Sequence, residues 1–437
     1  MKSLTGLIKT TRTRFAGLTD ARKGRNTKYS MEDFAPSALS VFFTQSPSFL
    51  AYQRTMQQNK GRSNAQSLFQ IEEIPSDNQT RETLDHVAPE EIFPLYDGVL
   101  GAFQEQGVLE PYRGLKGTLA VALDGTWYHA SEKIKCQHCS SIEHSNGQKT
   151  CYHSAITPVI VAPGKPHALP LRPEFMVPQD GHEKQDCEIA AAKRWLEKNS
   201  ERYSSLKVTL LGDDLYAHQP FCRRALLHSF HFLFTCKPAS HKTLYDWVNL
   251  LQPEDGLHTL KMRVKNKDKH WENHTYRFAS QAPLAEGDDA LKVNWCELTV
   301  TNDKGEILYR NAFITDYQIT AGNVAEIVAA ARARWKVENE NNHVLKNRGY
   351  HLEHNFGHGQ KHLSSLLAAL NILAFLYHTF LHFCDEKYRL IRAALPTRQT
   401  FFDDLRALTR YLLFADWDAL LDFMMRGLEI GPYAPAP

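Results

Sequence analysis

Short apolar runs that end in an acid alternate with helical stretches in the middle of the chain, and this alternation restricts the possible folds most. Residues 118–124 and 206–213 are apolar runs of strand length, and each ends in an aspartate. Residues 156–162 and 231–235 predict two further strands. Residues 182–199 carry apolar side chains at helical spacing and predict an amphipathic helix. Strands that alternate with helices indicate an α/β core.

The stretches around this core differ in pattern, and 437 residues are enough for several domains. We divide the chain into a helical N-terminal region (1–115), a first part of the core (116–236), a β insertion (237–319), a second part of the core (320–385) and a helical C-terminal region (386–437).

Particular elements follow from the same periodicities. The β insertion predicts antiparallel strands at 260–264, 274–278, 293–300 and 307–315. Helices are predicted at 37–52, 89–106, 321–347 and 363–383, with one or two more in the last fifty residues. Trp271 and Trp295 lie in the β insertion, where core packing is the expected role of each.

Charge and cysteine usage indicate the compartment and one class of partner. The formal charge of +2 is close to neutral, but residues 1–30 hold Lys2, Lys9, Arg12, Arg14, Arg22, Lys23, Arg25 and Lys28 against Asp20 alone. Such an arm can bind phosphates, with a solvated terminus as the alternative. Eight cysteines without a secretory signal do not indicate a disulfide scaffold, so we expect a cytoplasmic protein. Residues 363–383 contain several polar side chains, so they predict a buried core helix and no membrane span.

Three acids are candidates for catalysis. Asp124 and Asp213 follow predicted strands, where side chains converge at the edge of a sheet, although a single acid in such a position is more often a turn or helix cap. Asp214 is the alternative to Asp213. The third acid, Glu338, continues the apolar face of the helix predicted at 321–347, whereas Glu340 lies roughly 200° around that helix.

A carboxylate on a buried face must be paired or bound to metal. Arg334, one turn before Glu338, could supply a purely structural ion pair. Three carboxylates also suit Mg²⁺ or Mn²⁺, which prefer oxygen ligands. Two such ions can activate a water or a 3′-hydroxyl and stabilise the leaving oxygen of a phosphodiester.

The order strand–Asp124, strand–Asp213, β insertion and helix–Glu338 resembles the DDE transposases of bacterial insertion sequences, in the group with an RNase H-like core and a Tyr–Arg–Glu–Lys signature. Arg334 matches the arginine of that signature and Glu338 its glutamate. Lys346 falls one residue later than the usual lysine, and Ala331 replaces the tyrosine. Asp213-Asp-Leu-Tyr216 is similar to the Asp-x-x-Tyr turn of the group.

The resemblance implies an RNase H-like mixed sheet with flanking helices, interrupted by the β insertion. It also implies metal-dependent hydrolysis at transposon ends and strand transfer into target DNA. Asp124, Asp213 and Glu338 would hold two Mg²⁺ or Mn²⁺ ions. Double-stranded DNA, both the terminal inverted repeats and the target, would be the partner of a homodimer in the bacterial cytoplasm, associated with the nucleoid, and Arg334, Lys346 and Arg348 would contact phosphate. The alternatives are a nuclease that cleaves without joining, a non-catalytic DNA-binding protein and a zinc-dependent binding module.

A second candidate site lies between the first two core strands, in a hairpin at 134–154. Cys136, Cys139, Cys151 and His153 have the spacing of a small zinc ribbon, and they are the preferred tetrahedral ligands. His144 could replace Cys151 or His153. A second group, His351, His354 and His358, is not expected to bind metal.

Overall fold

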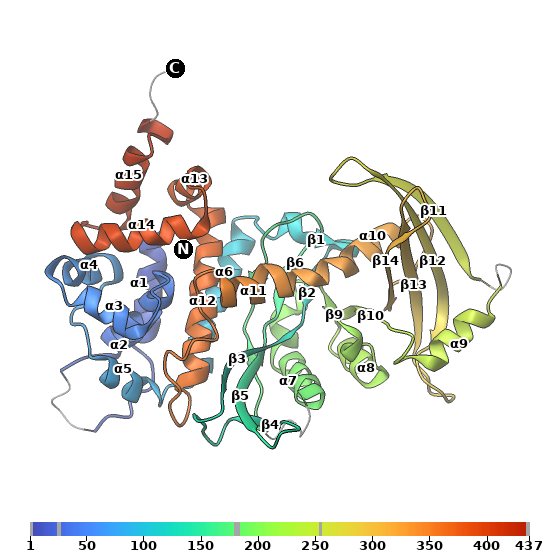
Figure 1. Cartoon of the computed structure of the whole chain (residues 1–437), viewed down its shortest axis with the longest axis horizontal. Coiled ribbons are helices and arrows are strands. Elements are labelled where there is room, and N and C mark those ends of the chain that lie inside the picture. Colours follow the sequence, from blue (N-terminus) through green and yellow to red (C-terminus); the bar gives the residue numbers. More distant parts are fainter. Residues whose placement is uncertain (1–2, 24–27, 179–183, 253–255, 434–437) are drawn as a thin grey trace.

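The computed structural model describes residues 3–23, 28–178, 184–252 and 256–433. Figure 1 shows a helical block at one end, a central region where strands and helices mix, and curved β strands at the other end. The first and last α-helices, α1 (Leu4–Phe15) and α15 (Trp417–Gly427), both belong to the helical block. The predicted α/β class is therefore confirmed at this level.

The main sheet is mixed and has the order β11-β12-β13-β14-β10-β9-β2-β6-β7. β2 is parallel to β9 and β9 is parallel to β10, whereas the other neighbours in this order are antiparallel. A short strand β1 (Arg113–Gly114) also pairs with β2. The strands are β2 (Thr118–Ala122), β6 (Val159–Val161), β7 (Leu169–Pro170), β9 (Val208–Gly212), β10 (His231–Thr235), β11 (His258–Lys265), β12 (Trp271–Pro283), β13 (Lys292–Thr301) and β14 (Ile307–Thr315).

Alternate residues of the central strands enter two different cores, because side chains of a strand point to opposite faces. Leu210 packs with Trp195 of α7 (Lys184–Ser204), on the side that also holds α8 (Gln219–Leu227). Leu211 packs with Val328 of α10 (Val324–Arg332) on the other side. Both faces of the sheet are thus covered, which explains why these strands are apolar along their whole length.

A small second sheet interrupts the chain between the first two strands of the main sheet. It consists of β3 (Gly125–Ser131), β4 (Ser140–Glu143) and β5 (Lys149–Ile156), and the short β8 (Glu174–Phe175) pairs with β5. This sheet contains the hairpin predicted at 134–154.

The helical block surrounds α12 (Leu363–Cys384). This helix is long and apolar enough to cross a membrane, but 89% of its most apolar stretch is buried inside the protein, as the prediction of a core helix requires. Around it lie α1 (Leu4–Phe15), α2 (Met31–Phe43), α3 (Phe49–Met56), α4 (Asn59–Phe69), α5 (Asp77–Leu84), α6 (Phe93–Glu105), α13 (Glu386–Ala394), α14 (Arg398–Tyr411) and α15 (Trp417–Gly427).

Several predicted elements have different bounds. The helix predicted at 37–52 is two helices, α2 and α3, separated near Pro47, because proline disfavours a helical conformation in the residue before it. Three helices occupy the C-terminal region in place of one or two, and α9 (Lys242–Leu250) lies within the predicted β insertion.

The N-terminal basic arm is partly a helix that packs on the protein. Leu7 and Phe15 of α1 are buried, and Arg12 forms ion pairs with Glu32 and Glu72, each at 3.1 Å. Lys2 and Arg25 lie outside the described residues. Arg12 is therefore neutralised within the protein, which the composition of the arm alone could not reveal.

Candidate active site and metal centre

Two of the predicted acids lie at the same edge of the main sheet. β2 and β9 are parallel neighbours with Ala122 opposite Leu211, so Asp124 and Asp213 both follow the carboxyl ends of adjacent strands. The Asp213 carboxylate accepts a hydrogen bond from the Leu215 amide at 2.9 Å. The carboxyl end of parallel strands is where α/β proteins most often place functional groups.

Asp214, the alternative to Asp213, is engaged elsewhere. Its carboxylate accepts hydrogen bonds from the Lys237 amide at 2.6 Å and from the Ser240 hydroxyl, and it lies 3.3 Å from His241 Nε2. Burial opposes the charged form, but these partners outweigh it and lower the pKa of Asp214 to about 2. Asp214 therefore stabilises the turn after β10, and Asp213 remains the candidate acid.

The third acid, Glu338, lies on a helix that changes its winding. α10 ends at Arg332, a 3₁₀ turn follows at Ala333–Trp335, Val337–Asn342 is π-helical, and α11 covers His343–Asn347. π-helical turns occur frequently at functional sites. Because the winding changes here, the face predicted from a constant 3.6-residue period does not continue.

Glu338 is consequently exposed, and the prediction from that face that it is buried was wrong. Its side chain is 49% exposed, and Trp335, one turn earlier on the same predicted face, is 44% exposed. Arg334 Nη1 lies 2.7 Å from Glu338 Oε1, which is the ion pair considered as the structural alternative. An exposed carboxylate beside an arginine remains accessible to solvent and ligands.

Asn342 connects this helix to the first strand. Its side-chain amide donates to Asp124 Oδ2 at 2.7 Å, and its carbonyl oxygen accepts from the Thr157 hydroxyl at 2.8 Å and from Asn341 at 2.9 Å. Asn342 is buried, so these contacts fix the orientation of the Asp124 carboxylate.

A fourth acid, Glu188 of α7, also belongs to this group and was missed from the sequence. It is buried, and the Tyr216 hydroxyl donates to its Oε1 at 2.7 Å. A Cβ at Gly125 would lie 2.4 Å from Glu188 Oε2, so only glycine leaves room for this carboxylate. The available signal was its position four residues before Ala192 and seven before Trp195, on the apolar face of the helix.

The four acids and Arg334 interact electrostatically. Burial raises the pKa of Asp124 to about 7, the charges of Glu188, Glu338 and Asp213 add to this effect, and Arg334 opposes it. Three separate parts of the chain thus contribute negative charge around Asp124. The site concentrates acids that repel one another, an arrangement more typical of function than of stability.

The other predicted phosphate-binding residues have different surroundings. Lys346 Nζ lies 2.7 Å from Glu353 Oε1, and Arg348 is exposed just after α11. Of the three predicted phosphate-binding residues, Arg334 is the one whose positive charge acts on Asp124.

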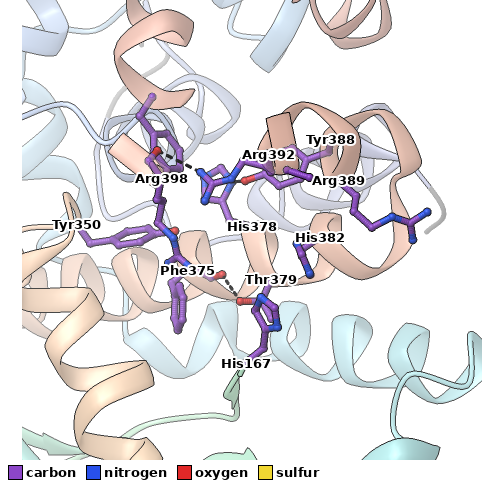
Figure 2. Close-up of a pocket in the computed structure, with 12 residues that line it drawn as sticks. His167, Tyr350, Phe375, His378, Thr379, His382, Tyr388, Arg389, Arg392 and Arg398 are labelled. Carbon is purple, nitrogen blue, oxygen red and sulfur yellow. Dashed lines mark hydrogen bonds between the residues drawn. The ribbon is translucent and has the colours of Figure 1, made fainter. Parts of the chain in front are cut away.

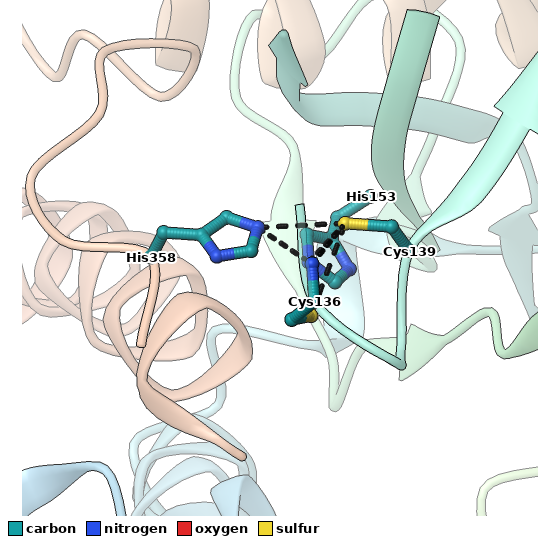
Figure 3. Close-up of side chains that lie close together, drawn as sticks. All are labelled: Cys136, Cys139, His153 and His358. Carbon is teal, nitrogen blue, oxygen red and sulfur yellow. Dashed lines mark hydrogen bonds between the residues drawn. The ribbon is translucent and has the colours of Figure 1, made fainter. Parts of the chain in front are cut away.

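A cluster of thiol and imidazole groups forms the second candidate site (Figure 3). The Sγ atoms of Cys136 and Cys139 and the Nε2 atoms of His153 and His358 all lie within 4.8 Å of one another. Cys139 Sγ is 3.8 Å from Cys136 Sγ and 3.4 Å from His153 Nε2, and the two histidine nitrogens are 3.2 Å apart.

These distances fit a tetrahedral zinc site. With zinc–sulfur bonds of about 2.3 Å and zinc–nitrogen bonds of about 2.0 Å, tetrahedral ligands lie about 3.8 Å apart for two sulfurs and about 3.3 Å for two nitrogens. The His358 ring also directs Nδ1 toward the Gly359 carbonyl at 3.0 Å, which leaves Nε2 for the cluster. The cluster can therefore hold a metal ion such as zinc.

The predicted ligand set was wrong in one member. Cys151 is outside the four-atom cluster, and His144 Nε2 contacts the Thr150 hydroxyl at 2.9 Å. The fourth position is taken by His358, 205 residues after His153 and from the loop before α12. His358 was not expected to bind metal, and its three partners lie more than 200 residues before it.

Within the described residues, this cluster is the one group of three or more Cys, His, Asp or Glu side chains whose donor atoms lie within 4.8 Å of one another. Asp124, Asp213 and Glu338 do not form such a compact group. The thiol and imidazole donors are thus closely spaced, whereas the carboxylates of the three acids are not.

A basic and aromatic surface lies on the hairpin of β11 and β12. Lys261, Arg263 and Lys265 alternate along β11 and are exposed, and Trp271, directly opposite Lys265, is 45% exposed. The guanidinium of Arg263 lies 5.0 Å from the Trp271 ring centre. The prediction of core packing was therefore wrong for Trp271, whereas Trp295 is buried as predicted.

The opposite face of this sheet is apolar and packs on α10. The basic face is therefore the outer face of the β hairpin.

No known family model matches the sequence, and no curated protein matches it with significant similarity.

Proposed function

We propose that the protein is a DNA transposase that cuts and joins DNA with the acids Asp124, Asp213 and Glu338. The observation that carries the proposal is the link between Asn342, on the helix of Glu338, and the Asp124 carboxylate. This contact joins residues far apart in the sequence, in the order that suggested the family. Glu188 and Arg334 complete the charged group around Asp124.

An RNase H-like core is part of the proposal. It is supported by a mixed sheet in which Asp124 follows a strand between one parallel and one antiparallel neighbour. Asp213 follows the parallel neighbour, and Glu338 follows the β insertion on a helix against the same sheet. Both faces of that sheet carry helices.

We assign a hard divalent cation to these acids, because the charges of three other carboxylates act on Asp124 and Mg²⁺ prefers oxygen ligands. Asp124, Asp213 and Glu338 would hold Mg²⁺ or Mn²⁺. When bound, two such ions supply an activated attacking oxygen and stabilisation of the leaving oxygen.

The residues of the chain have separable tasks in this reaction. Asn342 holds the Asp124 carboxylate in one orientation. Arg334 supplies positive charge beside Glu338 and can donate to a phosphate oxygen. The outer face of the β11–β12 hairpin carries lysines and an exposed tryptophan, which suit phosphate and base contacts respectively.

Zinc, in this proposal, is structural. Cys136, Cys139, His153 and His358 would close all four positions, as in structural zinc sites. The ion would tie the hairpin after Asp124 to the loop before α12, and so hold together the two halves of the core.

The test is Mg²⁺-dependent cleavage and strand transfer on DNA that carries the ends of the chain's own genetic element. Wild type is compared with Glu338→Gln and with Glu340→Gln as the matched control on the same helix. We expect Glu338→Gln to abolish both reactions while DNA binding persists, and Glu340→Gln to retain them.

Other outcomes separate the alternatives. Cleavage without joining would identify a nuclease, and binding without either reaction would identify a non-catalytic DNA-binding protein. Full activity of Glu338→Gln would remove this residue from the mechanism. Unfolding of the whole chain by EDTA, with no catalysis to lose, would favour a zinc-dependent binding module.

A further inference from the structure

A cavity lined by basic residues lies away from the acids, where α12, α13 and α14 meet (Figure 2). Its volume is about 170 Å³, an order of magnitude more than the roughly 15 Å³ that one water molecule needs. The lining includes three arginines, Arg389, Arg392 and Arg398, and the histidines His167 and His382. None of its twelve lining residues is acidic.

Two of the arginines are held by aromatic rings. The guanidinium of Arg392 lies 5.4 Å from the ring centre of Phe401, and that of Arg398 lies 5.8 Å from that of Phe375. One N–H of Arg392 donates to the Arg398 carbonyl at 3.1 Å. Attraction to the ring faces favours these positions of the two guanidinium groups, which still carry several N–H donors.

The positive charge of this cavity is not neutralised within the described part of the chain. No ion pair there involves Arg389, Arg392 or Arg398. Asp385, an acid near in sequence, instead caps α13 by accepting from the Tyr388 amide at 3.0 Å. A partly buried charge without a counter-ion is unfavourable, so binding of an anion in this cavity would lower the free energy.

The lowered pKa values of His167 and His382 reflect the same excess of positive charge. Burial lowers the pKa of His167 to about 4, and the neighbouring His382, Arg398 and Arg392 add to this effect. Burial also lowers the pKa of His382, again with contributions from Arg392 and Arg398. The rings of His167 and His382 lie with centres 4.2 Å apart, so both face the same cavity.

We propose that this cavity binds a phosphate group through Arg392 and Arg398. Arginine donates two parallel hydrogen bonds to oxyanions, and two fixed guanidinium groups can grip the oxygens of one phosphate. The phosphate can belong to a DNA backbone or be a free ion. Phosphate binding here does not depend on the catalytic role of the acids.

The experiment measures thermal unfolding of the full chain against inorganic phosphate, with chloride at equal ionic strength as the reference. We expect the midpoint of wild type to rise saturably with phosphate. Arg398→Gln should weaken phosphate binding by about tenfold or more, since hydrogen bonds to charged groups are at stake. Arg410→Gln, on the exposed side of α14, removes the same charge and should bind phosphate as wild type does.

A second readout is independent of variant stability. Phosphate should raise the pKa of the His167 and His382 imidazoles in wild type, as followed by NMR, because an anion favours their charged forms. Equal effects of phosphate and chloride on wild type would overturn the proposal, as would equally weakened phosphate binding in Arg398→Gln and Arg410→Gln.

A short DNA duplex distinguishes the source of the phosphate. If the DNA backbone supplies it, Arg398→Gln weakens duplex binding and makes the dependence on salt less steep, by the amount expected for about one bound phosphate. If a free ion supplies it, duplex binding is unchanged while the response to inorganic phosphate disappears. Both results support the phosphate site.

Discussion

The side-chain amide of Asn342 donates a hydrogen bond of 2.7 Å to the carboxylate of Asp124. Because the asparagine is buried and also bonded to Thr157, it holds that carboxylate in one orientation. We expect Asn342→Ala to reduce DNA cleavage by roughly 10- to 100-fold, as the loss of groups that orient metal ligands commonly does. Asn347→Ala, on the exposed side of α11, is the control and should cleave normally. Undiminished cleavage by Asn342→Ala would show that Asp124 needs no such support.

Asp213 and Asp214 are adjacent but should respond oppositely to removal of their charge. Asp213→Asn should abolish cleavage and leave folding intact. Asp214→Asn should keep cleavage but lower the free energy of unfolding by ~1–3 kcal/mol, because its carboxylate accepts hydrogen bonds from Lys237 and Ser240. Cleavage assays and urea denaturation of the two variants check this pair. Loss of cleavage in Asp214→Asn at full stability would reverse the assignment.

The sequence pattern located those features that depend on neighbours in the chain. The strand predicted at 231–235 has the observed bounds of β10, and the strands before Asp124 and Asp213 were also located. A buried strand is readable because its apolar run is continuous and local. The π-helical turn at Val337–Asn342 could not be predicted from the sequence, since periodicity arguments assume one constant helical repeat.

Features that join distant segments could not be predicted in the same way. Cys151 was preferred as a metal ligand because it lies close in sequence to Cys136, whereas His358 completes the cluster through the tertiary fold. Glu188 likewise joins the acids only once α7 packs against the sheet. Spacing identifies ligands within one hairpin, but a ligand from a remote loop is specified by packing.

Zinc content tests the corrected ligand set. His358→Ala should lose bound zinc and unfold at a lower temperature, because a closed structural site contributes to folding free energy. Cys151→Ser should retain the ion, since this cysteine lies outside the cluster. Metal analysis of the purified proteins, together with thermal unfolding, gives the result. Zinc retained in His358→Ala and lost in Cys151→Ser would restore the ligands expected from spacing.

The outer face of the β11–β12 hairpin should contribute to DNA binding. Replacing Lys261 and Lys265 by glutamine should weaken binding of any duplex and make the logarithmic dependence on salt less steep, by about 0.9 for each DNA phosphate that the variant no longer neutralises. The control replaces Lys242 and Lys292, two exposed lysines elsewhere in the insertion, and removes the same total charge. Fluorescence anisotropy at several salt concentrations measures both. Equal changes in the two double variants would reduce the effect to net charge alone.

Acid should destabilise the protein through His378. This ring is buried, with Nε2 2.9 Å from the Phe43 carbonyl and Nδ1 2.9 Å from the Tyr388 hydroxyl, and burial lowers its pKa to about 3. Below about pH 6.5 the His378 imidazole is protonated in the unfolded chain but stays neutral in the folded chain. The free energy of unfolding therefore falls as the pH drops from about 6.5 toward 3. One such group contributes a slope of up to about 1.4 kcal/mol per pH unit. Urea denaturation between pH 7 and about 4, without phosphate, should show a shallower slope for His378→Gln than for wild type, whereas His86→Gln, at an exposed position, should keep the wild-type slope. Identical slopes for all three proteins would mean that the His378 ring becomes protonated without unfolding.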